Sequence, residues 1–69
     1  MAKKYKYFTL QTEMLKNNES QEQVARLLGI SSTAVRYKLD AVREWTINEI
    51  EILCNHYNMN YYELFKKED

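Results

Sequence analysis

The chain has 69 residues, with ten basic and ten acidic side chains and therefore no net charge at neutral pH. This length fits one small domain with a modest core, for which dimerisation is a natural supplement. A single cysteine excludes an internal disulfide, which favours a reducing cytoplasmic setting, and neither a membrane span nor a secretory signal is visible. One glycine and no proline favour an all-α fold, and we expect a small bundle of five helices.

The charges are distributed unevenly along the chain. Residues 1–43 carry eight basic and four acidic side chains, whereas residues 44–69 carry two basic and six acidic ones. A polyanion would therefore be attracted to the first part and repelled by the second. The same asymmetry also arises by chance in short chains, so charge alone does not identify a nucleic-acid-binding protein.

The chain begins with a basic and aromatic segment, residues 1–8. Alternating side chains over residues 3–8 predict a short strand, and a basic arm or a solvated tail are equal alternatives. Thr9 is the expected cap of a first helix that ends at about Asn17. The side chains expected to face the core from this helix are Phe8, Leu10, Met14 and Leu15.

Two short helical patterns joined by a tight turn occupy residues 21–40. Ser20 is a good N-cap, and Gln23 completes a capping box. Gly29 falls where the first of these helices must end, because a residue there usually takes a left-handed conformation that glycine adopts at low cost. Ser31 can cap the second helix. Its outward face offers hydroxyls, one positive charge and one aromatic ring, from Ser32, Thr33, Arg36 and Tyr37.

This arrangement resembles the helix-turn-helix of the phage Cro and C1 repressor family, which has a lambda-repressor-like DNA-binding domain. The matching positions are Gln21, Ala25, Gly29, Ile30, Ser31 and Val35. Ala25 is small enough for the two helices to cross closely, and a recognition helix must be held at a fixed angle to enter the major groove. Two positions depart from the family pattern. Lys38 stands where an aliphatic side chain is common, and Asp40-Ala41 stands where Asn-Gly is common, although aspartate tolerates unusual backbone angles.

The rest of the chain reads as a connector and two further helices. Trp45 is the expected anchor of the connector, residues 41–45, because its large apolar surface favours burial. Thr46 and Glu49 form a second capping box, and Asn60 can cap a last short helix. The apolar side chains of the longer helix are Ile47, Ile50, Leu53, Cys54 and Tyr57. His56 is expected to be solvated, and no residue cluster indicates a metal site or a catalytic centre.

From the resemblance we expect residues 9–67 to form a helix-turn-helix domain that acts as a sequence-specific, Cro-like or repressor-like transcription regulator. It would read the major groove of an operator with residues 32–39, without a cofactor and without enzymatic activity. The candidate DNA contacts are Gln21, Ser31, Ser32, Thr33, Arg36, Tyr37, Lys38 and Arg43. The resemblance assigns Gln21 to a backbone phosphate, and Arg26 is a weaker phosphate candidate.

A protein-interaction module is the alternative function, for example an antirepressor that keeps the fold but binds another regulator. This alternative leaves Arg36 and the basic first part of the chain without a purpose.

A homodimer is expected, in solution or only on DNA, because one small domain covers about one half-site of a palindromic operator. The residues predicted for the two-fold interface are Tyr61, Tyr62, Leu64 and Phe65, with Trp45 or Tyr57 beside them. The reason is that a short final helix cannot bury all four of these side chains against its own chain. In the alternative arrangement Leu64 and Phe65 close the core of the monomer, and the arm at residues 3–8 pairs with its symmetry mate.

Overall fold

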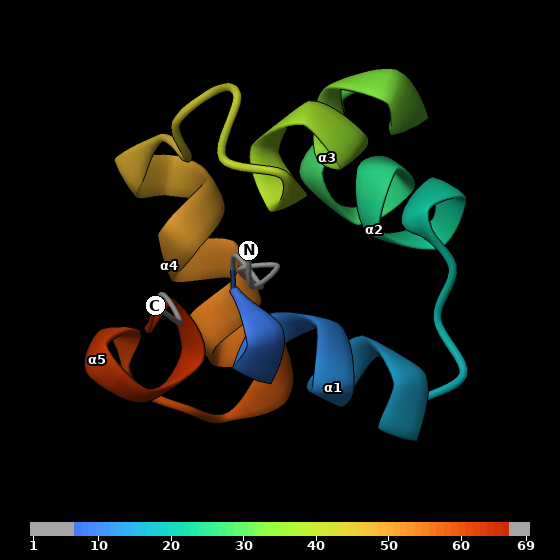
Figure 1. Ribbon diagram of the computed structural model, residues 1–69. Coiled ribbons are helices and arrows are strands. Elements are labelled where there is room, and N and C mark those ends of the chain that lie inside the picture. Colours follow the sequence, from blue (N-terminus) through green and yellow to red (C-terminus); the bar gives the residue numbers. More distant parts are fainter. Residues whose placement is uncertain (1–6, 67–69) are drawn as a thin grey trace, which may run out of the picture.

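The computed structural model describes residues 7–66, which contain five helices and no strand (Figure 1). The helices are α1 (Phe8–Lys16), α2 (Gln21–Leu28), α3 (Ser32–Leu39), α4 (Ile47–Tyr57) and α5 (Tyr61–Leu64). The all-α prediction is therefore confirmed for this part of the chain. None of these helices is long and apolar enough to cross a membrane. The predicted arm or strand falls mainly on residues 1–6, outside the described residues.

The first helix begins earlier than its sequence suggests. Tyr7, and not Thr9, occupies the N-cap position, with a left-handed backbone (φ 60°) and no capping hydrogen bond from its side chain. The Tyr7 ring is buried edge-on against Trp45 and Phe65, with centroids 6.1 and 6.0 Å apart. The start of α1 is therefore marked by a packed aromatic ring and not by a side-chain cap.

The core-facing stripe of α1 is narrower than predicted. Leu10 and Met14 are buried, four residues apart on one side of the helix. Phe8 and Leu15 were also expected to face the core, but both are exposed, because they lie on the side of α1 opposite to Leu10 and Met14. Ile47 of α4 is likewise exposed, since it is the first residue of that helix and lies off the stripe formed by Ile50, Leu53 and Tyr57.

The predicted N-caps of the four helices after α1 are confirmed. The Ser20 hydroxyl accepts the backbone N–H of Gln23 at 3.2 Å, and the Gln23 side chain accepts the N–H of Ser20 at 2.8 Å. Thr46 and Glu49 make the same reciprocal pair at 3.1 and 3.0 Å. Because each box satisfies two backbone donors that the first helical turn leaves unpaired, the starts of α2 and α4 are well defined.

The ends of α2 and α3 both require a left-handed residue. Gly29 ends α2 as predicted, with φ 75°, and a Cβ there would meet open space, so backbone conformation alone favours glycine. At the end of α3, Asp40 keeps an ordinary φ of −85°, and Ala41 takes the left-handed conformation instead, at φ 62°. An alanine pays roughly 1 kcal/mol for this conformation because its Cβ crowds the following carbonyl.

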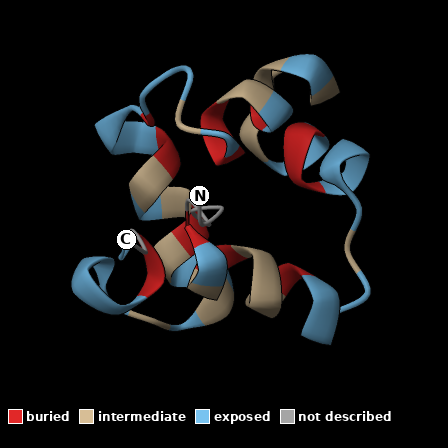
Figure 2. Ribbon diagram, in the orientation of Figure 1, coloured by how far each residue is buried: buried red, intermediate tan, exposed pale blue. Residues whose placement is uncertain are grey.

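The core lies between α1, α4 and α5 and extends between α2 and α3, where the buried segments face one another in Figure 2. Its fully buried side chains are Leu10, Val24, Val35, Leu53 and Leu64. Leu64 and Phe65 are 0% and 7% exposed, so the prediction that they form a dimer interface is wrong. They close the core of the monomer, as the alternative arrangement predicts. The one-turn helix α5 packs against α1 and α4, and this packing buries one side of it completely.

Candidate nucleic-acid interface

The α3 helix divides its side chains between the core and the solvent. Val35, Lys38 and Leu39 form the buried stripe. Thr33 and Arg36 on the other side are exposed, and Ser32 and Tyr37 are half-buried. Of the four side chains predicted for the outward face, Thr33 and Arg36 are therefore fully accessible, and Ser32 and Tyr37 are partly accessible.

Ser31 is committed to starting α3. Its hydroxyl oxygen accepts the backbone N–H of Ala34 at 3.1 Å, which is the capping role predicted for it. The hydroxyl hydrogen stays free to be donated, so Ser31 can still contact an anion, but its position is set by the cap.

Lys38 does not belong to the interface, and its predicted role as a DNA contact is wrong. Its ammonium group lies 2.6 Å from both carboxylate oxygens of Glu49, and the two side chains are 9% and 8% exposed. The ammonium nitrogen also lies 6.0 Å from the centroid of the Trp45 ring. Lys38 lies on the buried side of α3, at a position where an aliphatic side chain is common in the family that the sequence resembles. This departure from the family pattern was the sequence feature that could have indicated a structural role.

The Glu49 carboxylate connects α3 to the first turn of α4. Burial alone would raise its pKa, but hydrogen bonds from Lys38 and Thr46, together with the Lys38 charge, outweigh burial and lower the pKa. The carboxylate is thus ionised and accepts from both partners at neutral pH. The orientation of α3 depends on this buried ion pair as well as on apolar packing.

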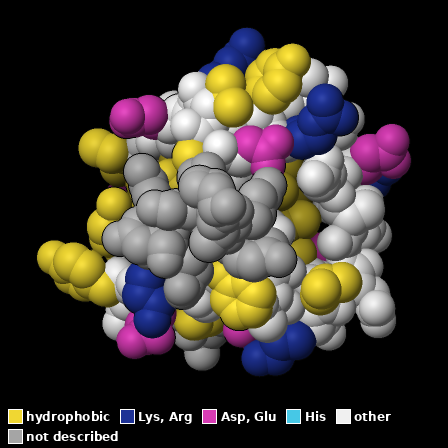
Figure 3. Space-filling view, in the orientation of Figure 1, with side chains coloured by type: hydrophobic (Ala, Val, Ile, Leu, Met, Phe, Trp, Pro, Cys, Tyr) yellow, Lys and Arg dark blue, Asp and Glu magenta, His cyan; other side chains and the backbone are white. Residues whose placement is uncertain are grey.

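Three arginines of this region are exposed and unpaired. Arg26, Arg36 and Arg43 make no ion pair with any carboxylate of residues 7–66, whereas Lys16 is paired with Glu13 at 3.1 Å. They come from α2, from α3 and from the loop after α3. Figure 3 shows basic and acidic side chains interspersed on one face of the molecule, without a continuous basic patch. Where this face is formed by described residues, attraction of a polyanion would therefore depend on a few positions.

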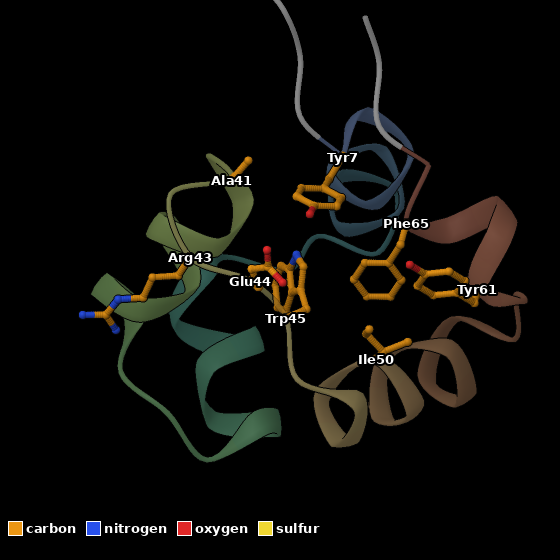
Figure 4. A pocket seen from close by; sticks show the side chains of 8 residues that line it. All are labelled: Tyr7, Ala41, Arg43, Glu44, Trp45, Ile50, Tyr61 and Phe65. Atoms are coloured by element: carbon orange, nitrogen blue, oxygen red, sulfur yellow. The ribbon is translucent and has the colours of Figure 1, made fainter.

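Arg43 is held beside α3. Its guanidinium carbon lies 5.4 Å from the centroid of the Tyr37 ring, within the range of a cation–π contact. Figure 4 shows its side chain directed away from the aromatic hollow formed by Trp45 and its neighbours. The structure therefore brings Tyr37 and Arg43 together, which the sequence did not predict.

Gln21 is the exposed first residue of α2, as predicted. It lines a hollow of about 310 Å³ together with Glu19 and Asp40. Two carboxylates next to this position disfavour a phosphate there. The phosphate contact that the resemblance implies for Gln21 stays a prediction, and these two carboxylates weigh against it.

The aromatic residues near the C-terminus fall into two groups. Trp45, predicted as an anchor, is buried against Phe65 with ring centroids 5.5 Å apart, so it is not available as the dimer neighbour that was also predicted. Its indole N–H is buried without a hydrogen-bond partner among the described residues. Tyr61 and Tyr62 are 52% and 83% exposed and pack edge to face on each other. Of the four predicted interface residues, only these two tyrosines remain accessible.

A polar cluster joining distant parts of the chain was missed. Glu19, in the linker before α2, accepts from the Tyr57 hydroxyl at 2.5 Å and lies 2.6 Å from Nε2 of His56. His56 was expected to be merely solvated. Burial alone would raise the pKa of Glu19, but the hydrogen bonds from Tyr57 and His56 lower it, while burial and the neighbouring carboxylate raise the pKa of Tyr57. The partners are 37 and 38 residues apart, and no local pattern signals such a contact.

No group of three or more His, Cys, Asp or Glu side chains within residues 7–66 is arranged to hold a metal ion. Comparison of the chain with models of known protein families, with curated proteins and with solved structures gives no match.

Proposed function

We propose that this chain is a sequence-specific DNA-binding regulator in which α2, the turn at residues 29–31 and α3 act as a helix-turn-helix of the lambda-repressor-like kind. The observation that carries the proposal is the division of α3 into a buried stripe and a polar outward face with an unpaired arginine. The fixed start of α3 at Ser31 and its ion pair to α4 support the proposal, because a reading helix must be held rigidly.

The dimensions of α3 suit the major groove of B-DNA. Its eight residues span about 12 Å, which is close to the groove width. Arg36 can bind guanine O6 and N7 with two hydrogen bonds, which is worth about 1–3 kcal/mol of discrimination. Thr33 can place its methyl group against thymine, and Ser32 can donate to either kind of base edge.

The proposed active species is a homodimer on two half-sites about one helical turn apart. Tyr61 and Tyr62 are the exposed aromatic residues that can meet a second copy, since Leu64 and Phe65 are used inside the monomer. Their exposure equally favours the second candidate function, a protein-interaction module that contacts another regulator through this tyrosine pair.

The deciding experiment is selection of bound duplexes from a random-sequence DNA pool, followed by affinity measurements at several salt concentrations. A DNA-binding regulator should enrich a motif, and its affinity should fall with a log–log slope of about −0.9 per neutralised phosphate. Arg36→Ala should weaken the selected duplex more than an unrelated one. The matched control is Arg26→Ala, which removes an exposed, unpaired arginine from α2 and should affect both duplexes equally.

Failure to enrich any sequence, combined with a flat salt dependence, would contradict DNA binding and favour the protein-interaction function. Equal losses on both duplexes for Arg36→Ala would leave Arg36 as a backbone contact only.

A further inference from the structure

The loop after α3 is fastened to the helix at the position of Tyr37. The Tyr37 carbonyl accepts the backbone N–H groups of Val42 and Arg43 at 2.8 and 3.2 Å. The N–H of Ala41 bonds to the carbonyl of Lys38 at 3.1 Å. The backbone that carries Arg43 is therefore fixed relative to α3 before any ligand binds.

The Tyr37 ring then holds the side chain of Arg43. The guanidinium carbon is 5.4 Å from the ring centroid, and Arg43 has no carboxylate partner in the described part of the chain. A guanidinium carries five N–H donors and a ring contact does not use all of them, so donors of Arg43 remain available to anionic oxygens. The contact also restricts a flexible side chain in advance, which reduces the entropy lost when a ligand is bound.

We propose that Tyr37 is a positioning residue that holds Arg43 for one backbone phosphate at the edge of the groove that α3 enters. The inference rests on the proposed DNA-binding function. Arg43 follows the C-terminal end of α3, while Thr33 lies in its first turn. Because α3 is about as long as the groove is wide, bases meet its start and middle, and the phosphates that border the groove lie near its end. Such a contact fixes register without reading sequence.

The first test is direct observation of the pair by NMR in the free protein. The ring current of Tyr37 should shift the Arg43 side-chain protons upfield in the parent and in Tyr37→Phe, which keeps the ring. The shift should be absent in Tyr37→Leu, while circular dichroism confirms that the helices are retained. Equal Arg43 shifts in Tyr37→Leu and the parent would overturn the proposed pairing.

The second test is a double-mutant cycle, measured on a duplex selected by the parent and on an unrelated duplex of equal length. Arg43→Ala should weaken both duplexes alike, by roughly tenfold, as expected for loss of a hydrogen bond to a charged group. It should also reduce the salt slope by about 0.9. Tyr37→Leu should lose part of the same affinity, and Tyr37→Phe, which keeps the ring, should lose less than Tyr37→Leu.

The cycle has a matched control background. Tyr37→Leu should have little further effect in Arg43→Ala but its full effect in Arg26→Ala, which removes another exposed arginine. Additive losses with Arg43→Ala would overturn the positioning role, as would a Tyr37→Phe loss as large as that of Tyr37→Leu. A loss confined to the selected duplex in Arg43→Ala would overturn the phosphate assignment. If the parent binds neither duplex, the proposed function itself fails, and this inference fails with it.

Discussion

Two polar bridges fasten α2 and α3 to the rest of the molecule, and water reaches them to different extents. The Lys38–Glu49 pair joins α3 to α4 with side chains that are 9% and 8% exposed. The Glu19–His56 pair joins the linker before α2 to the end of α4, with side chains that are 20% and 34% exposed. Both have an N···O distance of 2.6 Å. They differ in solvation and in the number of carboxylate oxygens contacted, which is two for Lys38 and one for His56.

The difference teaches that two polar pairs with the same N···O distance have different consequences when they are broken. A buried charge left without its partner has no water to replace it, whereas a partly exposed one is resolvated. The buried bridge thus fixes the orientation of α3, and the exposed bridge adds a smaller, pH-dependent contribution beside α2.

The largest expected effect follows from breaking the buried bridge on one side. Lys38→Met leaves the Glu49 carboxylate uncompensated, and we expect a loss of about 3 kcal/mol in the free energy of unfolding. In Lys38→Met/Glu49→Gln the amide still accepts the N–H of Thr46 but carries no charge, so most of the loss should be recovered. Urea unfolding followed by circular dichroism measures both variants. Equal stability of the single and double variants would refute the importance of the unpaired charge.

A smaller effect is expected at the exposed bridge, and it depends on pH. The pKa of Glu19 is lowered in the folded chain, so the unfolded chain takes up the proton first as pH falls. The stabilisation is therefore complete above the ordinary value near 4.5 and is lost as pH decreases through the folded pKa. Glu19→Gln should cost about 1 kcal/mol at pH 7 and flatten the acid limb of a stability–pH curve.

The control for the exposed bridge is Glu22→Gln, an exposed carboxylate in the first turn of α2. Its stability–pH curve should keep the steepness of the parent in acid. If the stability of Glu19→Gln falls with decreasing pH as steeply as that of this control, the loss of stability in acid would be due to Glu49 alone.

Gly29 and Ala41, the residues with left-handed backbone conformations after α2 and α3, allow a reciprocal pair of substitutions. Gly29→Ala should lower stability by about 1 kcal/mol, because alanine disfavours the left-handed conformation. Ala41→Gly should raise stability by about 0.5 kcal/mol, since relief of backbone strain is partly offset by the greater freedom of glycine in the unfolded chain. Thermal unfolding of both variants checks the opposite signs. A destabilised Ala41→Gly would mean that the half-buried methyl group outweighs the strain.

The smallest effect provides the baseline for a solvated ion pair. Lys16→Ala removes the contact with Glu13 within α1, at a side chain that is 65% exposed. A loss of only about 0.3 kcal/mol is expected from such a pair on a helix surface. A loss comparable to that of Glu19→Gln would remove the distinction between a bridge across the fold and a contact within one helix.

Sequence reasoning succeeded where the decisive interactions are local. The capping pairs Ser20–Gln23 and Thr46–Glu49 span three residues, and Gly29 acts through its own backbone, so residue type and spacing are enough to predict them. The outward face of α3 was predictable for the same reason, because Val35 and Leu39 already define the buried side.

The errors arose where distant packing decides. Lys38 has a charged side chain, which usually indicates exposure, but it is buried in an ion pair with a carboxylate eleven residues away. Glu19 contacts a histidine 37 residues away. Phe8 and Leu15 are as apolar as core residues, but which side of α1 faces inward depends on α4 and α5. The Tyr37–Arg43 contact requires the course of the loop after α3, which residue types do not specify.

The position of Trp45 makes its fluorescence a reporter of whether the fold is intact. This is the only tryptophan of the chain, and its ring lies 6.1 Å from Tyr7, 5.5 Å from Phe65 and 6.0 Å from the Lys38 ammonium. These three neighbours come from the start of α1, the end of α5 and the last turn of α3. Separation of any of these segments brings water to the indole and moves its emission to longer wavelength. One unlabelled fluorescence signal therefore reports on both ends of the chain and on the proposed reading helix at the same time.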